Sequence, residues 1–214
     1  MNNNNSSKQI LLSVLGVAIL VVAVVGISFA AFSYSQTGEV SNTITTGTIT
    51  MTYTEPTNGI NLTDALPITD EKGKALKGDN NTFDFTVGAT IAGTTNINYV
   101  ISAVKDATSD LPDTGVKVYL TATSGESETA VFEPKLVSQL NKTVDGNDAG
   151  APADQYILKT GNYTATGTDN YRLRMWVDSN YGQHTDGENT NTTEFATQHK
   201  YILKVNVYGA AKAQ

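Results

Sequence analysis

The sequence predicts an all-β fold, an antiparallel β-sandwich that is jelly-roll-like, preceded by an N-terminal apolar helix or signal segment. Three observations support this prediction. Apolar and polar residues alternate along most of the chain after residue 31, turn-forming residues separate the alternating stretches, and a long uncharged stretch comes before all of them. Alternation with a period of two residues is typical of antiparallel strands that have one buried and one solvated face.

The alternation identifies the expected strands. It is clearest at residues 49–53, 83–91, 97–101, 116–120, 171–177 and 201–207. Turn-forming pairs such as Asn58-Gly59 and Asp186-Gly187 lie between these stretches, and about seven to nine short strands with such turns favour two packed sheets. One short helix is expected at Glu133–Gln139, because Glu133-Pro134 begins an amphipathic stretch. Residues 141–152 are expected to form a long exposed loop.

The composition excludes several classes of protein. The 214 residues include no cysteine, so disulfide scaffolds, thiolate metal sites and cysteine nucleophiles are all absent. The formal net charge is −7. Binding to nucleic acid needs clustered Lys and Arg, so nucleic acid is not expected as a partner.

The uncharged stretch covers residues 10–32 and follows a polar start that contains Lys8. A helix of this length would cross a bilayer, so a retained membrane anchor is one interpretation. The other is a signal peptide cut by a signal peptidase between Ala30 and Ala31, since small residues precede this bond. Under both interpretations the rest of the chain is extracellular or at the cell surface. The expected parts are residues 1–30 as signal peptide or anchor, 31–38 as an extended segment and 39–214 as the β-sandwich.

The junction between the apolar stretch and the first strands resembles the TasA/camelysin family. The resemblance rests on Ala31-Phe32 at the start of the mature chain and on Asn42, Ile44, Gly47, Thr48 and Ile49 in the strand that follows. Residues 83–87, 97–101 and 200–208 are similar to later strands of the family. The resemblance covers residues 10–105 and 198–208 and is weak between them. It implies secretion, a jelly-roll domain and assembly into fibres of a biofilm matrix.

In this family an extended N-terminal segment of one subunit completes the sheet of the next. The corresponding donor strand in this chain would be Ala31, Phe32, Ser33, Tyr34, Ser35, Gln36, Thr37 and Gly38. Physically, such a strand satisfies the unpaired N–H and C=O groups of an open sheet edge. The contact is head-to-tail, so it would build a homopolymer. Two alternatives remain open: a flexible tail, or pairing of these residues within their own subunit.

The residues do not form a known catalytic or metal motif. The two histidines, His184 and His199, are not in a His-Glu-x-x-His arrangement, so neither catalytic residues nor a metal site is predicted and the chain is not expected to be an enzyme. Two acidic loops, 145–148 and 186–188, are candidates for calcium. Ordinary turn chemistry also explains both, so no cofactor is predicted.

Trp176 has two interpretations. It is a candidate for stacking on a carbohydrate, or it lies on a solvated strand face where the stems of Arg172 and Arg174 partly cover it. The expected function is that of a secreted structural subunit of an extracellular fibre. The alternative is a membrane-anchored surface adhesin or carbohydrate-binding module with the same fold. The expected partners are other copies of the chain, the signal peptidase during export, and a membrane only through residues 10–32 if they are retained.

Overall fold

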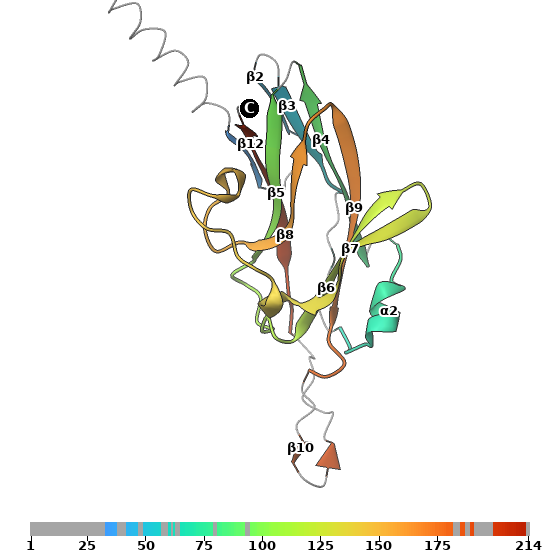
Figure 1. The fold of residues 1–214 in the computed structure, drawn as a ribbon. Coiled ribbons are helices and arrows are strands. Elements are labelled where there is room, and N and C mark those ends of the chain that lie inside the picture. Colours follow the sequence, from blue (N-terminus) through green and yellow to red (C-terminus); the bar gives the residue numbers. More distant parts are fainter. Residues whose placement is uncertain are drawn as a thin grey trace, which may run out of the picture. The chain divides into compact units, whose positions relative to one another are not determined.

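The computed structural model describes residues 33–37, 42–46, 49–56, 60, 62, 65–78, 81–92, 95–181, 185–186, 189–190 and 199–212. They form two large sheets of mostly antiparallel strands (Figure 1). The four-stranded sheet has the order β1-β12-β5-β8, and the six-stranded sheet has the order β2-β3-β4-β9-β6-β7. Two short strands, β10 and β11, pair with each other.

The strands follow one another along the chain with few helical turns between them. The first four strands are β1 (Ser33–Thr37), β2 (Asn42–Thr46), β3 (Ile49–Thr54) and β4 (Thr82–Ile91), with the short helix α2 (Asp70–Lys74) before β4. The middle strands are β5 (Asn96–Lys105), β6 (Val116–Ser124), β7 (Ser127–Leu136) and β8 (Tyr156–Tyr163), with single 3-10 turns η1 (Val137–Gln139) and η2 (Asp148–Gly150) before β8. The last strands are β9 (Gly167–Val177), β10 (Thr185–Asp186), β11 (Asn189–Thr190) and β12 (Leu203–Lys212).

The two sheets face each other, and contacts between them show which strands lie opposite. The hydroxyl groups of Tyr99 on β5 and Tyr171 on β9 are 3.1 Å apart. Tyr163 on β8 donates a hydrogen bond of 2.8 Å to the carbonyl of Val87 on β4. A Cβ atom at Gly209 on β12 would overlap the sulfur atom of a methionine on β3, so these strands are also close. Strands β12, β5 and β8 therefore lie opposite β3, β4 and β9, and η1 also contacts β6.

The structure confirms the expected strands at 49–53, 83–91, 97–101, 116–120 and 171–177, which correspond to β3, β4, β5, β6 and β9. The last expected strand, 201–207, is displaced, because β12 begins at Leu203 and continues to Lys212. Strands β7 and β8 were not expected from the alternation.

The expected helix at Glu133–Gln139 is wrong. Strand β7 continues to Leu136, and only the 3-10 turn η1 follows it. Pro134 lies on an edge strand of the six-stranded sheet, where a residue without an N–H group can face away from the ladder. The proline that suggested the start of a helix is thus compatible with an edge strand.

The expected exposed loop at 141–152 is also only partly right. Val144 is 58% exposed, but Ala151 is buried and packs with Val100 of β5 and Tyr208 of β12. The side-chain amide of Gln155, just after this loop, donates to the Tyr208 hydroxyl at 2.9 Å. The loop therefore covers the outer face of the four-stranded sheet, and β5 and β12 are buried on both faces.

Gly161 on β8 provides a test of how tightly the sheets pack. A Cβ atom at Gly161 would overlap the ring of the buried Tyr99, whereas a Cβ atom at Gly167 would come no closer than 3.7 Å to a neighbour. We expect Gly161→Ala to lower the free energy of unfolding by about 1–3 kcal/mol because of overpacking. The control Gly167→Ala should change it by less than about 0.5 kcal/mol. Urea unfolding of both variants measures the difference, and equal stabilities would contradict this packing.

Candidate strand-exchange site

The structure places part of the predicted donor segment. Ser33, Tyr34, Ser35, Gln36 and Thr37 form β1, which lies beside β12 at the edge of the four-stranded sheet of the same chain. In the single chain the segment thus pairs within its own subunit, which was one of the alternatives that the sequence left open. The other residues of the predicted segment, together with the predicted cleavage site, lie outside the described residues: Ala30, Ala31, Phe32 and Gly38.

Strand β12 offers a long and regular edge for such pairing. It pairs with β5 from Leu203 to Lys212 without a shift of register. The N–H group of Asp106 donates to the carbonyl of Ile202 at 3.0 Å, which makes these two residues a hydrogen-bonded pair. Backbone groups in an antiparallel ladder alternate between the two sides. The outward groups of β12 are therefore those of its odd-numbered residues, Leu203, Val205, Val207, Gly209 and Ala211.

The four edges of the two sheets differ in how they are protected. Strands β1 and β2 form one edge each, and β2 pairs with β3 without a shift of register. On β7, Pro134 and two shifts of register against β6 interrupt the edge. Such irregularities prevent further strands from adding to a sheet. The β7 edge is therefore a poor acceptor.

The β8 edge is covered only at its beginning. The N–H group of Ile157 donates to the carbonyl of Asn141, and the N–H group of Thr143 donates to the carbonyl of Gln155, each at 2.8 Å. A bulge follows, since the pairing with β5 shifts register between Ile101 and Ser102. From Lys159 to Tyr163 the pairing with β5 is regular, and β8 is the last strand in its sheet. This part of β8 is an open edge.

A cluster of tyrosines holds β8 and β5 against the six-stranded sheet. One carboxylate oxygen of Asp169 accepts hydrogen bonds from the hydroxyl groups of Tyr163 at 2.8 Å, Tyr171 at 3.3 Å and Tyr99 at 3.4 Å. Burial is the main cause that raises the pKa of all three tyrosines above the ordinary value. The cluster depends on protonated hydroxyl groups, so it joins the two sheets only while these groups are neutral.

The second large polar network lies on the outer face of the six-stranded sheet. Arg174 is only 2% exposed and donates to Glu128 at 2.8 Å, and Arg172 pairs with both Glu128 and Asp84. The hydrogen bond from Arg174 is the main cause that lowers the pKa of Glu128 to about 2. The network is therefore an ion-pair cluster that joins β4, β9 and β7.

Trp176 belongs to this covered face and not to a binding surface. Its side chain is 2% exposed, and a Cβ atom at Gly73 of α2 would overlap the indole ring. The helix α2 therefore lies on the ring and excludes a sugar from it. Both interpretations of a solvent-facing Trp176 are wrong, because α2 covers the ring, and the alternation in the sequence did not predict this helix. The glycine among the charged residues of 70–74 is the one signal that a bulky side chain is covered there.

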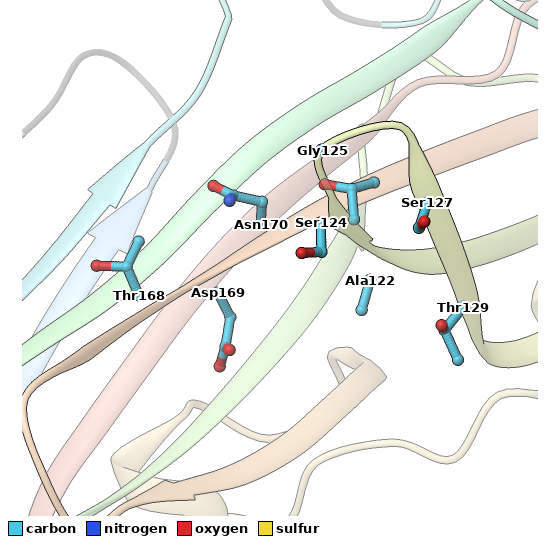
Figure 2. Close-up of a pocket in the computed structure, with 9 residues that line it drawn as sticks. Ala122, Ser124, Gly125, Ser127, Thr129, Thr168, Asp169 and Asn170 are labelled. Atoms are coloured by element: carbon cyan, nitrogen blue, oxygen red, sulfur yellow. The ribbon is translucent and has the colours of Figure 1, made fainter.

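A polar hollow of about 380 Å³ lies beside the turn between β6 and β7. Figure 2 shows the side chains that line it. Small and hydroxyl-bearing residues line it, together with Asn170 and Asp169, and the carboxylate of Asp169 points away from Asn170 and Thr168. This carboxylate is the one that the tyrosines bind. The lining includes no aromatic side chain, so the hollow has no platform on which a sugar ring could stack.

The candidate calcium loops lie in different environments. The side chain of Asp148 accepts a hydrogen bond of 2.9 Å from the N–H group of Val144, as in an ordinary turn. Asp186 lies in β10, whereas Glu188 and His184 are outside the described residues. His199 pairs with Asp110 at 3.2 Å. In the part of the chain that the structure describes, no three potential ligands form a group able to hold a metal ion.

The tyrosine cluster predicts loss of stability in alkaline solution. A tyrosine with a raised pKa binds its proton more tightly in the folded state, so the free energy of unfolding falls as the pH rises above about 10. Burial also raises the pKa of Tyr156, to about 12. We expect Tyr163→Phe to lose less stability between about pH 9 and about pH 11 than the parent protein. Urea unfolding of the variant and of the parent protein across this range measures the effect. If the free energies of unfolding of the two proteins fell in parallel with rising pH, the cluster would not control the alkaline loss of stability.

None of the helices among the described residues is long and apolar enough to cross a membrane, and residues 10–32 lie outside that part of the chain. Neither known protein-family models nor curated proteins match the sequence. Similarity therefore assigns no activity or partner.

Proposed function

We propose that the chain is an exported structural subunit of an extracellular fibre or biofilm matrix, and that it assembles head-to-tail by donor-strand exchange. The proposed fold is a jelly-roll-like β-sandwich preceded by an apolar helix or signal segment. The observation that favours this function most is the position of β1. It is an edge strand at the start of the described chain, directly after the apolar stretch, and its sheet partner is a strand from the far end of the chain.

An edge strand in this position is suited to exchange. The odd-numbered residues of β12 direct their backbone groups toward β1, and Val205 and Val207 are buried. Unpaired backbone groups beside a buried strand are costly, so the backbone hydrogen bonds of β1 stabilise the edge of β12. The sequence of β1, SYSQT, has no charged residue that would oppose pairing with another sheet. Backbone hydrogen bonds of this kind can form with any regular sheet edge.

In the proposed function, export is followed by cleavage of the chain just before the donor strand. A signal peptidase that cuts between Ala30 and Ala31 leaves the residues before β1 free from the membrane. The mature chain then begins two residues before Ser33, so the donor strand is at the end of the molecule. No catalytic step is part of this function, and no cofactor is needed for it.

A surface adhesin or carbohydrate-binding module remains the alternative, without a structural feature that favours it. The two functions predict different N-termini for the protein collected outside the cell. A fibre subunit should begin at Ala31, whereas an anchored adhesin should keep Met1 and stay in the membrane fraction. N-terminal sequencing of both fractions distinguishes them.

Deletion of residues 31–38 tests the function directly. The expected product is a folded monomer that does not form filaments, because the sandwich keeps its core and loses only an edge strand. Electron microscopy and circular dichroism of the secreted protein measure assembly and folding. Filaments at the parental yield after this deletion would contradict the proposal.

Proline at two adjacent positions of β1 gives a sharper test. In a paired edge strand, neighbouring residues direct their N–H groups to opposite sides, so only one of two adjacent prolines removes a hydrogen bond to the sheet. We therefore expect that one of Ser35→Pro and Gln36→Pro abolishes filaments while the other keeps most of them. Each variant is the control for the other. Equal effects of the two substitutions would show that this segment does not assemble as a paired strand.

A further inference from the structure

A groove between β7 and β8 is basic, although the chain as a whole has a net charge of −7. It has a volume of about 350 Å³, and its lining contains Lys135 of β7, Lys159 of β8 and otherwise uncharged residues. Among the described residues that line it, none is acidic. Glu133, the nearest acidic residue along β7, pairs with Lys74 beside α2. A cleft lined by charge of one sign attracts ligands of the opposite sign.

Aromatic rings position both lysines of the groove without neutralising them. The ammonium group of Lys135 lies 4.9 Å from the centre of the Phe132 ring, and that of Lys159 lies 5.5 Å from the centre of the Tyr171 ring. Among the described residues, no salt bridge joins either lysine to a carboxylate. A ring attracts an ammonium group but carries no net charge. Both lysines are therefore available to an anionic ligand.

The rest of the lining combines apolar walls with hydrogen-bonding groups. Val131 and Ile157 are partly buried and line the groove from β7 and β8. The side-chain oxygen of Gln139 accepts a hydrogen bond of 3.0 Å from the N–H group of Leu136, so its NH₂ group is the part that can donate to a ligand. Thr160 is exposed and adds a hydroxyl group. A sugar ring with a carboxylate fits this lining, because its C–H groups pack on apolar walls and its oxygens accept from the donors.

The short stretch of free edge in the groove favours a sugar over a peptide strand. The groove meets the open part of β8 only at Lys159 and Thr160. The N–H group of Ile157, before them, already donates to the carbonyl of Asn141 at 2.8 Å. A paired strand needs a longer edge than this, whereas the hydroxyl groups of a sugar ring can bond to single backbone groups. The two lysines of the lining are also too few to follow a nucleic-acid backbone.

We infer that the groove between β7 and β8 binds an acidic polysaccharide, and that Lys135 and Lys159 recognise the carboxylates of its sugars. This site goes beyond the proposed function and rests on it only for the extracellular location, where the chain meets such polymers. The lining belongs to one chain, so binding needs no assembly. In a fibre, each subunit presents one groove, and a long polysaccharide that contacts several grooves is held more tightly than by one.

Calorimetric titration of the secreted protein with short oligomers tests the site. The probes are a hexamer of galacturonic acid, a neutral hexamer of glucose, hexaglutamate and a short polyphosphate. The groove variant combines Lys135→Gln with Lys159→Gln. The matched control combines Lys72→Gln with Lys77→Gln, which removes the same charge from exposed positions on and just after α2. Circular dichroism checks that both variants are folded.

The parental protein is expected to bind the galacturonic acid hexamer more tightly than the other three probes. The groove variant should weaken this binding at least about tenfold, which corresponds to about 1.4 kcal/mol, and the control should change it by less than about twofold. Tighter binding of hexaglutamate, polyphosphate or the neutral hexamer, or no binding at all, would overturn the inference without any variant. Equal losses in the two variants would also overturn it. None of these results bears on filament formation, which is measured separately and tests the proposed function.

Discussion

The pairing of β12 on both of its edges is the constraint on which this structure depends. β12 is buried on its inner face against β3 and on its outer face beneath the loop that contains Ala151. A strand that is covered on both faces can expose its backbone groups only along its edges, and β12 has a protein partner on each edge. β5 supplies one partner over the whole length of the strand. The other comes from β1, a short segment at the opposite end of the chain.

This arrangement separates stability from assembly. The tyrosines around Asp169 and the ion pairs of Glu128 join strands in the middle of the two sheets, and neither involves β1. The core can therefore persist when β1 moves. β1 pairs with β12 through backbone hydrogen bonds, which are alike for any regular edge. The proposed polymer of folded subunits requires that the terminal strand be exchanged without unfolding of this core.

Much of the fold could be predicted from the sequence because the central strands have a clear period of two. Strands such as β4 and β9 have one face against the other sheet, and their alternating residues show it. β7 was missed because Pro134 and its neighbouring charges suggest a helix start, and only its position at an edge makes the proline acceptable. β8 was missed because Gly161 interrupts the apolar face, to make room for the ring of Tyr99.

The functional site was less predictable than the fold. The sequence predicts a donor segment, since the apolar stretch before it suggests where the mature chain begins. The partner edge depends on which strands end each sheet, and that follows from pairings between distant segments such as β12 with β5. The open part of β8 depends in addition on Asn141 and Thr143, which cover its beginning. Burial of Trp176 beneath α2 could not be foreseen either, because a five-residue helix leaves almost no periodic signal.

The central claim is that β1 leaves its own sheet and completes the sheet of the next subunit. Determination of the filament structure by electron cryomicroscopy tests this most directly, because the path of residues 33–37 between subunits becomes visible. The account predicts that these residues cross to the neighbouring subunit and pair with an edge strand of its sheet. A filament in which every β1 stays beside its own β12 would contradict it.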